Sequence, residues 1–302
     1  MGLFSFDELY QAADSGRPGV SVIAAGGADA TVLQALAEGT RRGWLRGIVT
    51  GRRSEIQETA AECGVDLSKL EVIDSESPAE TAVEQISLGH AQILMKGQIA
   101  TPDLMRAVLN QEKGLRTGRT LAQIVLMEIT PHARRFLLAD TGLCIQPEFR
   151  QKREILESLV AVAQRLGCDR PKVAVMSATE KVSKAMPDTE EALELQRLGE
   201  SGVLGECDVQ GPLSFDLAYA SDAGDKKRLE GKVIGAADAM LFPDLLSGNL
   251  TVKGIMYTAA CRFGGVIWGA RCPIVFMSRA DRLETRLNSL SFTLKCREAW
   301  GI

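Results

Sequence analysis

The stretch LMKGQIATPDLMRAVLN, residues 94–110, joins a short apolar run to a helical pattern. The apolar run ends in Lys96 and a glycine. Helical spacing begins near Thr101, with Pro102 suited to a first turn. In an open α/β sheet, ligands bind beyond the carboxyl ends of the strands. The stretch therefore predicts a strand–turn–helix unit that brings a lysine to a ligand-binding edge.

The residues before this stretch repeat the same alternation. Short apolar runs are followed by helical patterns, and the successive pairs are 19–25 and 29–43, 45–51 and 53–64, 70–76 and 77–89, and 91–97 and 101–111. Apolar strands that alternate with helices predict a parallel sheet with helices on both faces.

The later part of the chain has a different pattern. Runs at 120–129 and 134–140 are close enough to pair antiparallel, and a long amphipathic helix is expected at 148–167. Further elements are a strand at 171–178, a helix at 190–202, and the last strands within 235–245 and 265–279. A length of 302 residues suits two domains. We expect two α/β lobes with a cleft between them.

The composition excludes several classes of protein. The 35 basic and 39 acidic residues give a net charge of −4, so no nucleic-acid-binding surface is expected. No apolar stretch reaches the ~20 residues that span a membrane, and the first residues do not resemble a secretory signal. Seven scattered cysteines without a CxxC motif indicate reduced thiols in a cytoplasm. With only two histidines, neither a metal site nor a histidine relay is expected.

Lys96, Thr101 and Arg106 form the first candidate site. Thr101 is a suitable N-cap, and a free helix N-terminus favours an anion. A lysine beside it and an arginine little more than one turn later predict an oxyanion or phosphate pocket. The alternative is that Lys96 extends to solvent and Arg106 pairs with Asp103.

Three other stretches follow expected strands. AAGG (24–27) lacks the GxGxxG pattern of dinucleotide sites, so its glycines are expected to permit a tight turn or close backbone approach. Asp140, in DTGLCIQP, either has a function or begins a turn. LFPDLLSGNL (241–250) predicts either a loop that approaches a ligand with its backbone or a structural turn.

MSRADRLETRLNSL (277–290) gives a second candidate set. Ser278 and Arg279 end an apolar run, and Asp281 and Glu284 are expected in the first turns of a following helix. A hydroxyl, a guanidinium and a carboxylate at one strand tip are a usable catalytic set, because arginine binds phosphate with a planar fork. The alternative is an N-cap serine with acidic residues that complement the helix dipole.

Taken together, these stretches resemble the phosphate acetyl/butyryltransferase family, and its butyryl branch most closely. The resemblance covers nearly the whole chain. It is carried in order by seven stretches, which are LMKGQIATPDLMRAVLN, GLRTG (114–118), FLLADTGLCIQP, VAVMSATEK (173–181), GPLSFDLA (211–218), LFPDLLSGN and MSRADRLETRLNS.

The resemblance implies a fold similar to isocitrate and isopropylmalate dehydrogenases, with the active site in the interdomain cleft. Residues 1–117 and 268–302 would form the first lobe, and 118–267 an inserted second lobe. It also implies reversible transfer of a short acyl group, such as butyryl, between coenzyme A and phosphate by direct attack in a ternary complex. Coenzyme A would be a substrate, with no tightly bound cofactor and no metal. The protein would be a homo-oligomer.

The resemblance also assigns residues. Arg106 falls on the family's phosphate-binding arginine, and Lys96 is a feature of the butyryl branch. Ser278 and Arg279 fall on the pair near the thioester. Binding of coenzyme A or the acyl substrate is assigned to Ser177, Asp244, Ser247, Gly248 and Asn249.

The catalytic base is the position at which this sequence departs from the family. The acetyl branch has a carboxylate seven residues after the serine, where this chain has Thr285. The remaining candidates for the base are Asp281 and Glu284.

Two rival functions remain open at this point. The missing carboxylate at Thr285 leaves room for an inactive homologue that binds coenzyme A or acyl phosphate without turnover. A dehydrogenase of similar architecture would need a metal-ligand cluster and a dinucleotide site, and the sequence shows neither. Absorbance at 340 nm with NAD and hydroxy acids would separate that activity from acyl transfer.

Overall fold

The computed structural model describes residues 2–16, 19–276 and 282–301. The chain divides into two compact units. Unit I comprises residues 6–119 and 264–302, and unit II comprises residues 1–5 and 120–263. Each unit is an α/β structure with its own section of sheet, so the predicted α/β class is confirmed.

The sheet of unit I has the strand order β3-β2-β1-β4-β11-β10. Its strands are β1 (Ser21–Ala25), β2 (Arg46–Gly51), β3 (Glu71–Asp74), β4 (Ile93–Lys96), β10 (Cys261–Trp268) and β11 (Ile274–Val275). The first five strands in this order are parallel, and β10 pairs antiparallel with β11. The carboxyl ends of β1 to β4 and β11 therefore meet at one edge.

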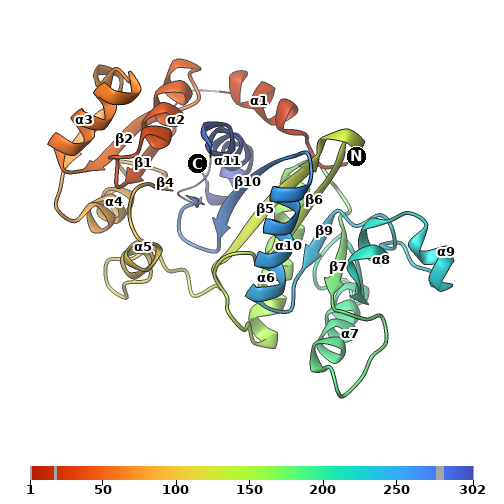
Figure 1. The fold of residues 1–302 in the computed structure, drawn as a ribbon. Helices are drawn as coiled ribbons and strands as arrows, with labels where there is room; N and C mark the ends of the chain where they lie inside the picture. The colour runs from red at the N-terminus through yellow and green to blue at the C-terminus, as the bar shows by residue number, and fades with distance from the viewer. Residues whose placement is uncertain (1, 17–18, 277–281, 302) are drawn as a thin grey trace. The chain divides into compact units, whose positions relative to one another are not determined.

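The helices of unit I are α1 (Phe6–Asp14), α2 (Ala30–Arg41), α3 (Arg53–Cys63), α4 (Pro78–Ser87), α5 (Thr101–Val108) and α11 (Leu283–Cys296), with 3-10 turns η1 (Leu67–Lys69) and η3 (Arg297–Trp300). Every residue of β1 and β4 is buried, which requires cover on both faces of the sheet. The blue helix α11, from the end of the chain, packs against α1 and α2 from its beginning (Figure 1).

The sheet of unit II has the order β5-β6-β9-β7-β8. Its strands are β5 (Ala122–Ile129), β6 (Arg134–Ala139), β7 (Lys172–Met176), β8 (Asp208–Leu213) and β9 (Ala239–Leu241). The predicted antiparallel pair is confirmed, because β5 and β6 form a hairpin closed by the 3-10 turn η2 (Thr130–His132). Strands β6, β9, β7 and β8 run parallel.

The helices of unit II are α6 (Phe149–Arg165), α7 (Pro187–Glu200), α8 (Phe215–Tyr219), α9 (Ala223–Lys227) and α10 (Leu245–Thr258). The long helix predicted at 148–167 is confirmed as α6. It begins with a capping box in which Glu148 and Gln151 satisfy each other's backbone groups.

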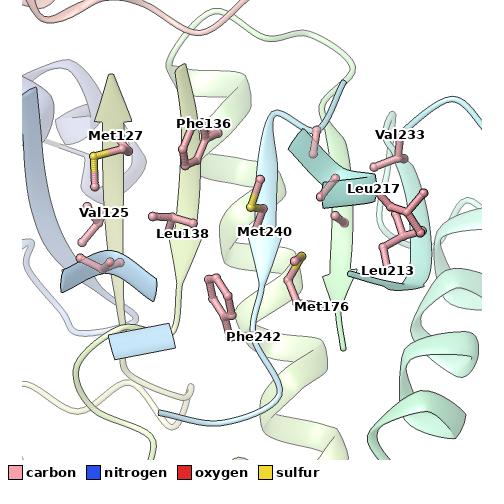
Figure 2. Close-up of a cluster of buried hydrophobic side chains, with 14 of the residues drawn as sticks. Val125, Met127, Phe136, Leu138, Met176, Leu213, Leu217, Val233, Met240 and Phe242 are labelled. Carbon is pink, nitrogen blue, oxygen red and sulfur yellow. The ribbon is translucent and has the colours of Figure 1, made fainter. Parts of the chain in front are cut away.

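One face of this sheet carries a continuous apolar core. Figure 2 shows Val125, Phe136, Met240 and Met176 side by side on neighbouring strands. Val252 joins the cluster from α10, which therefore covers this face. The core fixes α10 against the strands, and the first turn of α10 holds several of the predicted substrate-binding residues.

The expectation of a loop or turn over LFPDLLSGNL is wrong for its second half. Ser247, Gly248 and Asn249 lie in the first turns of α10. Glycine and asparagine usually interrupt helices, but tertiary packing overrides that preference here. Gly248 is where the helix backbone passes so close to the Asp140 carbonyl oxygen that a Cβ would overlap it.

Candidate active site

Lys96 is the last residue of β4, in the middle of the unit I sheet. Ala25 of β1 is its register partner on one side, and the residue before it, Met95, aligns with Val275 of β11 on the other. The side chain is only 4% exposed, so the alternative in which Lys96 extends to solvent is wrong. Its Nζ donates to the Gly97 carbonyl oxygen at 3.3 Å. The structure thus places a buried ammonium group at the carboxyl edge of the sheet.

The turn after Lys96 packs tightly against the turn after β1. The Gly97 amide donates to the Ala25 carbonyl at 2.9 Å, and the Gln98 amide donates to the Gly26 carbonyl at 2.8 Å. A Cβ on Gly97 would overlap the Gly26 carbonyl oxygen. Gly26 has φ +86°, which favours glycine. The close backbone approach predicted for AAGG is confirmed, and it leaves the Lys96 tip in a rigid setting.

Helix α5 begins one residue earlier than the sequence suggested. Its N-cap is Ala100, and Thr101 and Pro102 are its first two residues. The prediction of Thr101 as N-cap is therefore wrong, and no side chain caps the helix. The first backbone N–H groups of α5 have no acceptor from a capping side chain and remain suited to an anion.

Arg106 lies on the exposed side of α5, next to Asp103. Its side chain is 72% exposed, and its Nη1 lies 3.0 Å from Asp103 Oδ1, the pairing weighed as an alternative from the sequence. It lines a cavity of about 570 Å³ together with residues of α4, including Glu80 and Glu84. Lys96 is not among the residues that line this cavity.

The second candidate set falls only partly within the described residues. Ser278, Arg279 and Asp281 lie outside them. Glu284 is the second residue of α11 and is exposed, whereas Thr285 beside it is buried. Of the two candidate bases, Glu284 is the one for which the structure gives a position, close to the start of a helix.

A buried charged cluster, which the sequence analysis did not predict, contacts the backbone of Lys96. Arg286 of α11 is only 1% exposed. Its Nη2 lies 3.2 Å from Asp29 Oδ2, its Nε donates to Thr31 Oγ1 at 2.6 Å, and its Nη1 donates to the Lys96 carbonyl oxygen at 3.3 Å. Asp29 also caps α2 by accepting from the Val32 amide. Asp29 after a glycine pair and before a helix was a recognisable cap, but its arginine partner was not recognisable.

Asp140 follows β6 at the carboxyl edge of the unit II sheet. Its carboxylate accepts from the backbone amides of Gln123, Gly142 and Leu143 at 2.9–3.1 Å, and also from that of Cys144. Asp140 is buried and organises its own loop, so the sequence-based alternative of a turn-forming aspartate agrees with the structure.

The predicted coenzyme A residues gather at the same edge. Asp244 is the N-cap of α10 and accepts from the Ser247 amide at 2.8 Å. Asn249 Nδ2 donates to the Thr141 carbonyl at 3.0 Å, which ties α10 to the Asp140 loop. Ser177 follows β7, and its hydroxyl donates to Asp188 at 2.6 Å. Because β6, β9 and β7 are parallel, the structure brings these residues to one edge.

The cysteines offer no activated thiol among those with a shifted pKa. Burial, with a contribution from Asp140, raises the pKa of the Cys144 thiol to about 12. Burial also raises the pKa of Cys168 and of Cys272 to about 12. A thiol with so high a pKa is protonated at neutral pH and is a poor nucleophile.

Within residues 2–16, 19–276 and 282–301, no group of three or more His, Cys, Asp or Glu side chains is arranged to hold a metal ion. In the same part of the chain, no helix is long and apolar enough to cross a membrane.

Comparisons with known proteins agree with this arrangement. Residues 75–294 match the family described as phosphate acetyl/butaryl transferase. Phosphate butyryltransferase of Clostridium acetobutylicum is 34% identical over 95% of this chain and 96% of its own. Phosphate acetyltransferase of Thermotoga maritima is 34% identical over 88% of this chain and 91% of its own.

The fold leads to the same group of proteins. The crystal structure of a branched-chain phosphotransacylase from Enterococcus faecalis superposes with a TM-score of 0.80. It is 31% identical and covers 92% of this chain and 99% of that one. The resemblance inferred from the seven stretches is thereby confirmed, and the chain belongs to the phosphate acetyl/butaryl transferase family.

Proposed function

We propose that the protein is a phosphate acyltransferase that moves a short acyl group reversibly between coenzyme A and inorganic phosphate. The observation that carries this conclusion is family membership over nearly the whole chain. The buried Lys96 at the carboxyl edge of a parallel sheet supports it, because this is where such sheets bind ligands. The relatives divide between butyryl and acetyl transfer, and we propose butyryl as the preferred group.

The reaction proceeds by direct attack in a ternary complex. In one direction a phosphate oxygen attacks the thioester carbonyl, the C–O bond forms, and the C–S bond breaks to release coenzyme A as thiolate. In reverse, the thiol loses its proton to a base, its sulfur forms the C–S bond, and phosphate leaves. The high pKa of Cys144, Cys168 and Cys272 supports a route without a cysteinyl intermediate.

The site residues have distinct roles in this proposal. Lys96, the N–H groups of the turn that begins at Thr101, and Arg106 bind phosphate. Ser278 and Arg279 stabilise the charge that develops on the thioester carbonyl oxygen. The base is Asp281 or Glu284, since Thr285 cannot accept a proton at neutral pH.

Coenzyme A is a substrate and not a resident cofactor. We propose that it contacts the first turns of α10 at Asp244, Ser247, Gly248 and Asn249, together with Ser177. A helix N-terminus favours the phosphate groups that coenzyme A carries.

The larger-scale expectations remain predictions. Units I and II would correspond to the two lobes of an isocitrate dehydrogenase-like fold, with the active site in the cleft between the lobes. We also propose a cytoplasmic homo-oligomer, with seven free cysteines in support of a reducing compartment.

The decisive experiment follows release of coenzyme A thiol from acetyl-, propionyl-, butyryl- and isobutyryl-CoA, with and without phosphate. We expect phosphate-dependent release that is fastest with butyryl-CoA. Faster release from acetyl-CoA would assign the protein to the acetyl branch of the family. A folded protein that binds coenzyme A and shows no phosphate-dependent release would be an inactive homologue.

The Arg106–Asp103 pair allows a sharper test of the phosphate site. Arg106→Ala should raise the phosphate KM about 10-fold or more, because a charged donor to phosphate is lost. Asp103→Ala is the matched control, since it breaks the same surface ion pair without removing the cation. Equal effects of the two variants would mean that only the pair matters and that Arg106 does not bind phosphate.

A further inference from the structure

Arg286 is a fully buried cation that joins three separate elements of unit I. It lies on α11, contacts the start of α2 through Asp29 and Thr31, and donates to the carbonyl of Lys96 at the end of β4. Helix α11 is buried over most of its surface. A guanidinium group in such surroundings is tolerated only when its donors are matched by acceptors.

The geometry requires the shape of an arginine and not its charge alone. The planar fork directs three donors to acceptors at two places, two at the start of α2 and one at the end of β4. A lysine could keep the attraction to Asp29, but its single ammonium group could not hold Thr31 and the Lys96 carbonyl in the same way.

Two of these elements carry or follow residues of the proposed active site. Lys96 provides the buried ammonium group at the end of β4. Helix α11 is the element that follows Ser278 and Arg279 in the chain. Arg286 therefore connects the strand end that carries Lys96 with the helix that follows Ser278 and Arg279, which are proposed to act on the thioester.

Stability alone does not require such a connection. A buried ion pair is often replaced by apolar residues without loss of stability, so its presence is weak evidence for a purely stabilising role. A cross-link that fixes the relative position of two elements can serve catalysis, because small displacements of reacting groups reduce catalysis strongly.

We propose that Arg286 is a positioning residue that, with Asp29, fixes the Lys96 end of β4 relative to the first turn of α11. The proposal rests on the phosphate-binding role of Lys96 given above. Arg286 acts through the Lys96 backbone carbonyl and through α11, and it does not itself touch the substrates.

The test compares Arg286→Lys with the double variant Asp29→Asn/Arg286→Met. The lysine variant keeps a cation opposite Asp29. The double variant removes both charges and leaves an asparagine that can still cap α2. For both we expect the phosphate KM to rise about 10-fold or more, with the acyl-CoA KM changed less than twofold. We expect the melting temperature of the double variant to be near that of the unmodified protein.

The control is the partly buried pair Lys152–Glu191, which joins α6 to α7 in unit II. Lys152→Met/Glu191→Gln removes both charges of an ion pair in unit II, whereas Lys96 belongs to unit I. Its phosphate KM should stay unchanged. If it rises as much as in the Arg286 variants, the effect is a general response to lost ion pairs and the proposal is overturned.

Lys96→Met separates the two hypotheses. If Lys96→Met raises the phosphate KM but both Arg286 variants retain the normal value, positioning by Arg286 is wrong and the Lys96 site stands. If Lys96→Met leaves the phosphate KM unchanged, the Lys96 site itself is wrong, and the positioning role falls with it.

Discussion

The two sheet edges use buried charge in opposite ways. At the edge of unit II, the Asp140 carboxylate accepts from four backbone amides, three in its own loop and one in strand β5. At the edge of unit I, Lys96 carries a buried ammonium group, and Arg286 donates a hydrogen bond to its backbone carbonyl oxygen. The first arrangement uses a charge to build a loop. The second surrounds a cation with buried structure, as expected if the proposed phosphate site lies in unit I.

Asp140→Ala should have the largest effect. It removes the acceptor of four amides around a buried position, and we expect the free energy of unfolding to fall by about 3–5 kcal/mol. Urea titration measures this loss. Asp140→Asn, which keeps one acceptor oxygen, should lose about half as much. A loss below about 1 kcal/mol for the alanine variant would show that the carboxylate is not what holds the loop.

Gly248→Ala tests the contact between α10 and the same loop. The added Cβ would overlap the Asp140 carbonyl oxygen, so we expect a loss of about 2–3 kcal/mol. Gly254→Ala is the control in the same helix, where the Cβ meets open space. It should stabilise the protein by up to about 1 kcal/mol through helix propensity. Thermal unfolding of both variants measures these changes in stability. If both variants changed the stability in the same direction, the contact between α10 and the Asp140 loop would be wrong.

Lys96→Met should affect phosphate binding and not stability, which is the opposite of what we expect for Asp140→Ala. Replacing a buried ammonium group by a thioether of similar length should leave the melting temperature almost unchanged. The phosphate KM should rise about 10-fold, equivalent to ~1.4 kcal/mol. A large loss of stability without a change in phosphate KM would show that Lys96, like Asp140, serves stability. The contrast between the two edges would then be wrong.

Asp208→Asn tests the amino edge of unit II, where no site is proposed. Hydrogen bonds from Arg170, aided by Lys232, hold the pKa of Asp208 at about 2. Because the folded pKa lies below the unfolded value of about 4, the stabilisation is complete above pH ~4 and disappears as pH falls through 2. Arg170 is half-exposed, so we expect only about 1 kcal/mol at pH 7. A variant that differs equally at pH 7 and pH 2 would contradict this account.

The sequence predicted most of the elements that position the site. The alternation before residue 117 has a short-range cause, since strand and helix periods are local, and the strand tip at Lys96 followed from it. The pairing of Arg106 with Asp103 was also visible, because the two residues are three apart on one helix.

The failures have long-range causes. Ser247–Asn249 appeared to be a turn because only the packing of Gly248 against Asp140, 108 residues earlier, explains a glycine in that helix. Arg286 was not singled out in the sequence, because its partner Asp29 lies 257 residues away. No local pattern distinguishes a buried arginine from an exposed one when its acceptors come from another part of the chain.

The position of β11 has a consequence for biosynthesis. Strand β4 pairs with β1, which is made before it, and with β11, which is made some 180 residues later, as the register of Leu94 with Ile274 shows. On the ribosome, one side of β4 stays without its neighbour until nearly all of the chain has been synthesised. The segment 120–263 of unit II is continuous and emerges in the meantime. The Lys96 end of β4 is therefore among the last parts of the molecule to be completed, although it is encoded in the first third of the chain.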